Sequence, residues 1–392
     1  MSRSHLPPRP AHTTPRRSAT RGAHRVVLLA TAVLVGACSR DVAYPLAPAA
    51  SAASATLNSE REGERGSGQH YLIADQFNNR VIEVDGAGTI RWHFGGGPDN
   101  VGPTAVIGVN DAERVGELTL MAGTGAPPGA EPACPSGCAD NRVLLVDRAG
   151  KIVWQYGQFG ITGAGPNQLN TPVQNTYLPN GNVLITDQGN QRVIEVERRH
   201  NTIVWQYGTT GVAGAGPNQL NNPNSAELLE NGRVLIADEN NDRAIEVDRA
   251  HHVLKTYTAQ GTVSGVAFAS RLPNGHTLIT DSNHNRIVEV DKADHAVWQY
   301  VTNTEPGSNA APLPTRAVRL RDGSTLISDQ FNHRVIQVDR AGMIVRTFGH
   351  LNAAGYGTAT TQEGLNAPYD AKVIGDFTGL TNPRNDENEE ER

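Results

Sequence analysis

Residues 178–208, LPNGNVLITDQGNQRVIEVERRHNTIVWQYG, decide the fold, because the chain carries six edited copies of this stretch. Its apolar runs VLIT, RVIEV and IVWQY are separated by clusters rich in Gly, Asn and charged residues. None of them follows the 3.6-residue period of an amphipathic helix. The preceding run TYL leads into Pro-Asn-Gly, a hairpin signal, because Asn and Gly adopt positive φ at little cost. Each copy is therefore predicted to be a four-stranded antiparallel meander.

An arginine at the start of the third strand marks each copy. These arginines are Arg80, Arg142, Arg192, Arg243, Arg286 and Arg334, and the intervals between them are 62, 50, 51, 43 and 48 residues. An all-strand repeat of roughly 40 to 50 residues is typical of a β-propeller blade, whose sheet becomes stable by stacking against its neighbours. The chain is therefore predicted to be an all-β, six-bladed propeller.

The two ends of the repeat region are predicted to close the ring together. The first copy starts at His70 with a segment that corresponds to a second strand. The last copy is followed by LNAPYDAKVIGDFTG at 365–379, which matches LNNPNSAELLENG at 220–232. The C-terminal segment would supply the inner strand of the first blade and leave no unpaired edge at the seam. The propeller is predicted to span residues 69–379.

The N-terminus has the pattern of an export signal. Residues 1–37 contain six arginines, no acidic residue and the apolar run VVLLATAVLVGA, which is too short to cross a bilayer. The sequence Val-Gly-Ala-Cys at 35–38 resembles a bacterial lipobox, which implies that Cys38 becomes the lipid-modified first residue. An ordinary signal cleaved near Ala37 is the alternative. The expected location is the cell envelope, on the periplasmic or outer side of a membrane.

The segments that flank the repeats lack any apolar period. Residues 38–68 are rich in Ala, Ser, Pro and Glu and are predicted to form a disordered tether, and 380–392 a disordered acidic tail. Removing the six signal arginines leaves 28 basic residues against 40 acidic ones, a formal charge near −12. This charge disfavours nucleic acid as a partner. We expect a monomer that binds an envelope protein or a small molecule and touches the membrane only through Cys38.

The second copy departs from the repeat. Gly123 stands where the other copies have aspartate, and the insertion APPGAEPACPSGCAD follows at 126–140. In an exported protein, Cys134 and Cys138 most simply form a disulfide. A redox-active or metal-binding dithiol is the alternative, but no nearby histidine completes a zinc ligand set. We therefore predict a disulfide and no metal site.

A charged turn joins the second and third strands of the other five copies. It reads DQFNNR at 75–80, DQGNQR at 187–192, DENNDR at 238–243, DSNHNR at 281–286 and DQFNHR at 329–334. These turns resemble those of the NHL repeat family, and the resemblance implies a propeller without implying an activity. A structural role is favoured, because one axial ligand would not need the same residues on every blade. The aspartate can accept backbone hydrogen bonds within its turn and the arginine can pair with a neighbouring blade.

The inner strands are expected to line an axial channel. Alignment on their prolines places Ala105, Gln174, Ser225, Arg316 and Asp370 at equivalent positions, with Gly265 in the fifth blade, and places Asn224, Thr315 and Tyr369 one residue earlier. Both sets are polar and uneven, which favours a ligand site over pure packing, with a water-filled channel as the alternative. The predicted ligand-binding residues at the channel mouth are Gln174, Asn224, Ser225, Arg316, Tyr369 and Asp370.

Two functions are compatible with these patterns. The first is a binding or scaffolding module. The second is a periplasmic transferase or hydrolase, because LPNGNVLITD and IVWQYG are also similar to arylsulfotransferase-like propellers, in which a histidine accepts the sulfuryl group. His284 and His333 lie on the matching face. The chain also resembles quinone-cofactor (PQQ-like) propellers, but those have eight blades and an axial calcium site, so no cofactor is expected. A metal-dependent lactonase is disfavoured, because Asp370 is the one carboxylate in the aligned channel sets.

Overall fold

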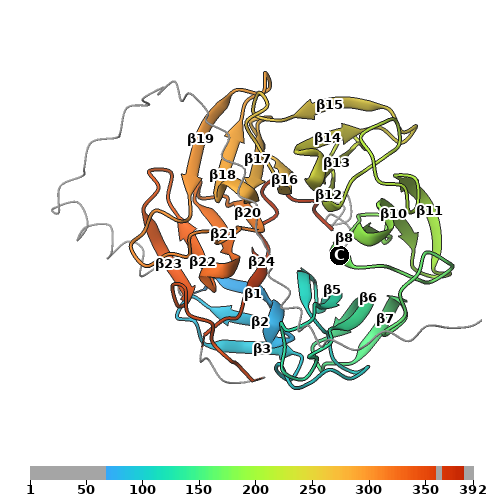
Figure 1. The fold of residues 1–392 in the computed structure, drawn as a ribbon, viewed down its shortest axis with the longest axis vertical. Helices are drawn as coiled ribbons and strands as arrows, with labels where there is room; N and C mark the ends of the chain where they lie inside the picture. The colour runs from blue at the N-terminus through green and yellow to red at the C-terminus, as the bar shows by residue number, and fades with distance from the viewer. Residues whose placement is uncertain (1–67, 359–363, 384–392) are drawn as a thin grey trace, which may run out of the picture. The chain divides into compact units, whose positions relative to one another are not determined.

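The computed structural model describes residues 68–358 and 364–383. Within these residues the strands form six four-stranded antiparallel sheets arranged as the blades of a ring (Figure 1). The predicted six-bladed β-propeller is therefore confirmed. The predicted signal at 1–37, Cys38, the tether up to residue 67 and the tail from residue 384 lie outside the described residues.

Each blade has four strands, which follow one another from the axis outwards. Blade 1 consists of β24 (Pro368–Val373), β1 (His70–Asp75), β2 (Arg80–Asp85) and β3 (Ile90–Phe94), and blade 2 of β4 (Val109–Val115), β5 (Leu118–Ala126), β6 (Cys138–Asp147) and β7 (Ile152–Gly157). Blade 3 consists of β8 (Pro172–Tyr177), β9 (Val183–Asp187), β10 (Arg192–Glu197) and β11 (Thr202–Tyr207), and blade 4 of β12 (Pro223–Leu228), β13 (Val234–Asp238), β14 (Arg243–Val247) and β15 (Val253–Tyr257). Blade 5 consists of β16 (Val266–Arg271), β17 (Thr277–Asp281), β18 (Arg286–Val290) and β19 (Ala296–Val301), and blade 6 of β20 (Arg316–Arg319), β21 (Thr325–Asp329), β22 (Arg334–Val338) and β23 (Ile344–Gly349). The polar turns of blades 1, 3, 4, 5 and 6 are 3-10 turns: η1 (Gln76–Asn78), η2 (Gln188–Asn190), η3 (Glu239–Asn241), η4 (Ser282–His284) and η5 (Gln330–Asn332).

The ring closes as the sequence predicts. Strand β24 pairs antiparallel with β1, in a register that places Ile73 opposite Ala371. The chain then continues beyond residue 379, where the tail was predicted to begin. Leu380 packs against the core, and the backbone N–H and the hydroxyl of Thr381 donate to Glu227 Oε2 of blade 4 at 2.9 and 2.6 Å. The predicted boundary at residue 380 therefore falls too early, because the segment after β24 is still packed against the ring.

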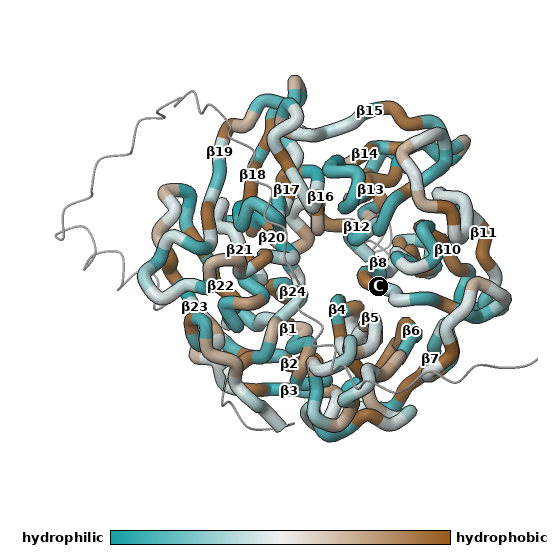
Figure 2. Tube along the Cα trace, in the orientation of Figure 1, coloured by the Kyte–Doolittle hydropathy of each residue, from teal (hydrophilic) through white to brown (hydrophobic). Residues whose placement is uncertain are grey.

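The hydrophobic core lies between neighbouring blades. All five side chains of the second strand VLITD, β9, are buried, because a middle strand is covered on both faces. One cluster joins Leu145 of blade 2 to Ile185 and Ile194 of blade 3, and similar clusters form at the other junctions. Hydrophobic stretches lie in the strands and hydrophilic ones in the turns (Figure 2). Each sheet therefore buries its faces only by stacking against its neighbours.

The repeated charged turns hold the blades in place. In blade 3, Asp187 accepts hydrogen bonds from Arg192 Nε at 2.7 Å, Asn190 Nδ2 at 2.8 Å and the Asn170 backbone N–H at 2.8 Å. Burial raises the pKa of Asp187, and the pairing with Arg192 opposes that rise. Gln191, which lies between Asn190 and Arg192, has positive φ. Its Oε1 accepts the backbone N–H of Asn222 in blade 4 at 2.6 Å. Equivalent acceptors serve every junction, namely Asn79, Asn141, Gln191, Asp242, Asn285 and His333. These turns therefore have a structural role, because each one forms a hydrogen bond to the next blade.

In blade 2 the contacts of the turn aspartate are made by an aspartate at a different position. Gly123 occupies the place of the missing aspartate, and a Cβ atom there would lie 2.2 Å from Asp140 Oδ2. Asp140 pairs with Arg142 Nε at 2.5 Å and accepts the Ile107 backbone N–H at 2.8 Å. The carboxylate that the repeat lost at Gly123 is thus supplied from the following strand, β6.

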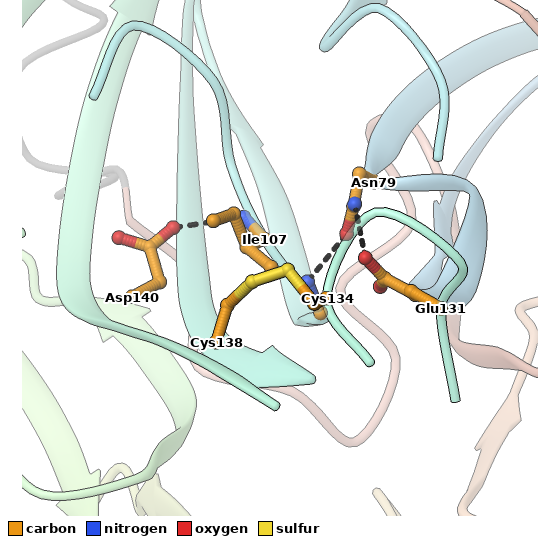
Figure 3. Close-up of a disulfide and its surroundings, with 7 residues drawn as sticks. Asn79, Ile107, Glu131, Cys134, Cys138 and Asp140 are labelled. Carbon is orange, nitrogen blue, oxygen red and sulfur yellow. Dashed lines mark hydrogen bonds between the residues drawn. A yellow bond between two sulfur atoms is a disulfide. The ribbon is translucent and has the colours of Figure 1, made fainter. Parts of the chain in front are cut away.

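The insertion in blade 2 contains the predicted disulfide between Cys134 and Cys138 (Figure 3). Beside it, the buried carboxylate of Glu131 accepts a 2.7 Å hydrogen bond from Asn79 Nδ2 of blade 1. A disulfide is consistent with an oxidising, exported compartment. In the part of the chain that the structure describes, no helix is long and apolar enough to cross a membrane.

Candidate functional site

The inner strands β24, β4, β8, β12, β16 and β20 surround the axis (Figure 1). Their pairing registers show that Asp370, Gln174, Ser225 and Arg316 occupy equivalent positions, opposite Ala74, Thr186, Ala237 and Ser328. Alignment on prolines was wrong in two blades. In blade 2 the equivalent residue is Asp111, because β4 starts at Val109, and Ala105 lies in the preceding loop. In blade 5 it is Phe268, because Gly265 precedes β16.

Most of these equivalent side chains point toward the next blade. Gln174 Oε1 accepts the Ala226 backbone N–H at 2.7 Å, and Ser225 Oγ accepts that of Ala269 at 3.3 Å. Asp111 and Asp370 make the corresponding contacts with the backbone of blades 3 and 2 at 3.2 and 3.1 Å. The predicted residues Gln174 and Ser225 are therefore buried and hold neighbouring inner strands together.

Four buried side chains form what we term the axial charge cluster: Asp111, Arg316, Asp370 and Lys372. Arg316 Nη2 lies 2.9 Å from Asp111 Oδ1, and Arg316 Nε lies 2.6 Å from Asp370 Oδ1, although the latter geometry is that of an ion pair without a hydrogen bond. Lys372 Nζ lies 2.8 Å from Asp111 and 2.6 Å from Asp370. Arg316 also stacks on Phe268, with its Cζ 4.3 Å from the ring centre. Two cations thus balance two anions at the axis of the ring.

Burial and charge set the pKa values within the axial charge cluster. Burial would lower the pKa of Lys372 and of Arg316, but the two aspartates raise both. Burial raises the pKa of Asp111 to about 6, against the opposing effects of Lys372 and Arg316. For Asp370 the same two cations outweigh burial and hold the pKa of its carboxyl below its ordinary value. Asp111 is therefore the member of the cluster that gains a proton first on acidification.

The side of the axis where the inner strands end is covered by the protein itself. Glu113 and Glu227 are buried there, and Glu227 is hydrogen-bonded to Thr381 from the C-terminal segment. Burial raises the pKa of Glu113 to about 8, and the nearby Glu227 adds to this effect. The C-terminal segment also contacts blade 6, where Asp376 accepts the Arg321 backbone N–H at 2.8 Å. The other side, which carries the charged turns, is where a ligand would approach.

On that side, polar side chains make what we term the mouth belt: Gln76, Asn110, Asn224, Glu239, Gln330 and Tyr369. Tyr369 of blade 1 reaches across the axis to blade 4, where its hydroxyl lies 3.0 Å from Asn224 Nδ2. Asn224 Nδ2 also donates to Glu239 Oε2 at 2.9 Å. Burial raises the pKa of the Tyr369 hydroxyl, and it raises that of Glu239 despite hydrogen bonds from Asn224 and Asn222.

Amides complete the mouth belt. Gln330 Nε2 donates to Gln76 Oε1 at 2.8 Å, and Gln76 Nε2 donates to Asn110 Oδ1 at 2.7 Å, so this chain of bonds links blades 6, 1 and 2. Tyr369 and Glu239 remain only half-buried. The belt is thus uncharged apart from Glu239. Its four amide side chains are buried and bond to other belt members, and Tyr369 and Glu239 are its more exposed residues.

The structure therefore brings the six predicted site residues together only in pairs, Arg316 with Asp370 and Asn224 with Tyr369. Sequence reasoning missed Asp111, Glu113 and Lys372. A signal for Asp111 and Glu113 was present, because VNDAERV at 109–115 matches PNSAELL at 223–229 better than any segment that starts at a proline in this blade.

The two histidines proposed for catalysis serve the turns. His333 Nδ1 accepts the Ala367 backbone N–H at 3.1 Å, and burial lowers the pKa of His333, which favours the neutral ring that this contact requires. His284 Nδ1 lies 3.0 Å from both oxygens of Asp281, at the position where blades 1, 3, 4 and 6 have asparagine. Within residues 68–358 and 364–383, no hydrogen bond or ion pair joins a histidine to the axial charge cluster. No group of three or more His, Cys, Asp or Glu residues in these ranges is placed to hold a metal.

Comparison with known proteins identifies the fold. No protein-family model matches the chain, and no curated protein is similar to it in sequence. A protein of unknown function from Bacteroides caccae has a similar structure, with 14% identity, a TM-score of 0.52 and coverage of 78% of this chain and 99% of that one. A streptogramin B lyase (11% identity, TM-score 0.49, 79% and 94% covered) and the WD40 β-propeller domain of Doa1 (12%, 0.46, 74% and 85%) also match. At 14% identity the likeness to the Bacteroides caccae protein concerns the fold alone and says nothing about activity.

Proposed function

We propose that this protein is an exported, NHL-like propeller that acts as a binding module and takes a neutral, hydrogen-bonding ligand or partner segment at the mouth belt. The observation that carries the proposal is the contrast between two layers of the channel. The charges of the axial charge cluster are committed to one another, whereas the layer above them consists mainly of amides with a half-buried tyrosine and one carboxylate.

The chemistry of the mouth belt suits amide or hydroxyl groups. Asn224, Gln76 and Gln330 each have both donor and acceptor atoms, and Tyr369 adds an aromatic face that can stack on a ring or a peptide plane. An anionic ligand would be opposed by Glu239, and in the described part of the chain no group of three or more His, Cys, Asp or Glu residues is placed to hold a metal cation. Loops on a rigid scaffold are where binding residues commonly gather, and the mouth belt lies on the side of the charged turns.

Export is part of the proposal. The signal pattern of residues 1–37, the lipobox-like sequence that ends in Cys38 and the disulfide of blade 2 all support an oxidising envelope compartment. A lipid on Cys38 and a tether to residue 68 would hold a monomeric propeller near the membrane, and the acidic charge argues against a nucleic-acid partner. Metabolic labelling with a fatty acid tests this directly, because Cys38→Ser should abolish both the label and membrane association.

The alternative, an arylsulfotransferase-like transferase or a hydrolase, needs a histidine or another base beside the reacting group. Its support is the repeat resemblance together with Arg316. The described contacts of His284, His333 and Arg316 are all with other parts of the propeller, so we favour the binding module. Turnover of aryl sulfate esters that is lost in a His284→Asn variant would reverse this preference.

The test of the binding module is capture from an envelope extract with the full-length protein as bait, followed by thermal-shift assays with N-acetylated amino sugars and neutral tripeptides. Tyr369→Phe and Asn224→Ala should weaken binding, because each removes one partner of the bond across the mouth. Tyr300→Phe, on the outer strand of blade 5, is the matched control and should bind as the parent protein does. Equal binding by all three variants would show that the mouth belt is not the site.

A further inference from the structure

A groove of about 500 Å³ runs along the outer edge of the ring between blades 1 and 2. It is lined by the outer strand of blade 1, by the loop that follows this strand and by a turn of blade 2. The lining residues include Arg91, Trp92, His93, Phe94 and Arg148, of which Phe94 is largely buried in the core. Two arginines, a histidine and two aromatic rings in one groove are unusual on a chain whose formal charge is −6. The groove is also distant in sequence and in blade position from Asn224 and Glu239 of the mouth belt.

The other five blades provide an internal comparison for this groove. The sheet registers align Arg91 with the exposed aliphatic residues Val153, Val204, Leu254, Val297 and Val345. They align His93 with Gln155, Gln206, Thr256, Gln299 and Thr347, which are all neutral. The repeat itself therefore needs neither the arginine nor the histidine. Only blade 1 departs at both positions, and it does so where the groove lies.

Arg91 and Arg148 do not use all of their N–H groups in contacts within the protein. Arg91 uses Nε and Nη2 on one oxygen of Asp85, at 2.9 and 2.6 Å, and Arg148 uses Nη1 on Glu83 at 2.6 Å. Among the described residues, no hydrogen bond engages Arg91 Nη1 or Arg148 Nη2, whereas the Nδ1 atom of His93 is buried without a partner. The Arg91 and Arg148 side chains are 55% and 41% exposed, so both can reach a bound anion. The groove therefore combines bound carboxylates that fix the arginines with N–H donors that remain available.

The backbone beside the groove is equally available. Strand β3 is the edge of its sheet and, among the described strands, pairs only with β2. Trp92 is fixed by a 3.0 Å bond from its Nε1 to the backbone oxygen of Arg148, so the strand edge and the blade 2 turn are held in one arrangement. An edge strand exposes unpaired N–H and C=O groups that can accept a further strand.

We propose that this groove binds an acidic peptide in extended conformation, which adds to β3 as a fifth strand of blade 1 while its carboxylates contact Arg91, His93 and Arg148. The open length along β3 favours an extended chain over a compact anion, and the cations select acidic side chains. This second site is independent of the mouth belt, so the proposal can stand if the proposed function there fails.

The test uses full-length protein and fluorescein-labelled decapeptides in an anisotropy titration at low salt. The probe alternates Glu and Val. One comparison peptide alternates Lys and Val, and another alternates Glu and Pro, which keeps the charge but favours the polyproline II conformation over a strand. The variant Arg91→Val/His93→Gln installs residues that blades 2, 3 and 5 already carry, so it should fold. The matched control Arg199→Val/His200→Gln makes the same changes in an exposed turn of blade 3.

We expect the Glu-Val peptide to bind most tightly, to weaken as salt is added and to lose about ten-fold in affinity in the Arg91→Val/His93→Gln variant, but not in the control. Tyr369→Phe should leave this binding unchanged. Equal binding of the Lys-Val peptide, or undiminished binding by the groove variant, would overturn the proposal. So would binding of the Glu-Pro peptide as tight as that of Glu-Val, or competition by inorganic phosphate at the same concentration of charge, because both outcomes would indicate a small-anion site.

Discussion

Glu113 should make this propeller less stable as the pH rises, and replacing it with glutamine should remove that effect. The side chain is buried beside the axis, and its Oε2 accepts the Tyr177 backbone N–H at 2.8 Å. Burial raises the pKa of Glu113 from 4.5 to about 8, because Lys372 is already matched by Asp111 and Asp370 and offsets only part of the desolvation. The folded protein therefore keeps this proton at neutral pH.

The sign and size of the effect follow from proton linkage. Between pH 4.5 and about 8 the folded state holds a proton on Glu113 that the unfolded chain has lost, so the free energy of unfolding falls as the pH rises. One pKa unit corresponds to about 1.4 kcal/mol, so the loss approaches 5 kcal/mol by about pH 8. Glu113→Gln keeps an acceptor for Tyr177 and carries no charge. Its stability relative to the parent should therefore increase by about this amount between pH 4.5 and 8.

Urea unfolding of the full-length protein and of Glu113→Gln at pH 5, 6.5, 8 and 9 measures this difference. Other titrating groups, such as Asp111, are present in both proteins, so their contributions largely cancel in the comparison. Glu230→Gln, at an exposed position in blade 4, is the control and should track the parent at every pH. If the Glu113→Gln and parent stabilities run parallel across this range, Glu113 is ionised in the folded protein and the reasoning is refuted.

Three further predictions concern stability and are checked by urea unfolding midpoints. Asp140→Ala should cost about 3 to 5 kcal/mol, because it leaves Arg142 buried without its carboxylate, and adding Gly123→Asp should recover much of the loss by restoring the arrangement of the other blades. Cys134→Ser should cost about 2 kcal/mol, the chain-entropy value for a five-residue loop, and a reductant should then have no further effect. Arg316→Ala should cost about 3 to 5 kcal/mol, because two buried aspartates lose a partner, so loss of function in this variant would not identify a ligand contact.

The sequence predicted the fold because the information lies in local patterns that recur. Each blade has the same short apolar runs and the same charged turn, and the unpaired start at His70 together with the strand-like segment 365–379 allowed one closed arrangement. The inner strand of blade 5 was misplaced because residues 257–271 contain no proline to align on, and that of blade 2 for a different local reason. A proline tends to begin a strand where no N–H bond is needed, but Pro103 lies in a loop, and β4 begins after Gly108, whose φ is +55°.

The candidate site was only half predictable. The residue types at the channel were correct in four blades, yet their partners depend on the closed ring. The pairing of Arg316 with Asp370 joins adjacent blades, whereas its pairing with Asp111 joins blades 6 and 2. No spacing rule in a single sequence gives the second contact. Without Asp111 and Lys372, Arg316 looked like a ligand anchor, but with them it is the centre of a neutral, buried cluster.

The repeats also separate structural from functional differences, because each blade serves as a reference for the other five. Where a departure is compensated within the protein, as Asp140 compensates for Gly123, it preserves a contact that all blades share. Arg91 and His93 differ from this pattern, because they replace neutral residues that suffice in the other blades, and the exposed Arg91 keeps an unused N–H group beside the groove. The fold does not require Arg91 or His93, so binding of a ligand is the simplest explanation for these two residues. The same reasoning makes Arg91→Val/His93→Gln the most informative variant, because the change conserves everything that the repeat needs and removes only what is particular to blade 1.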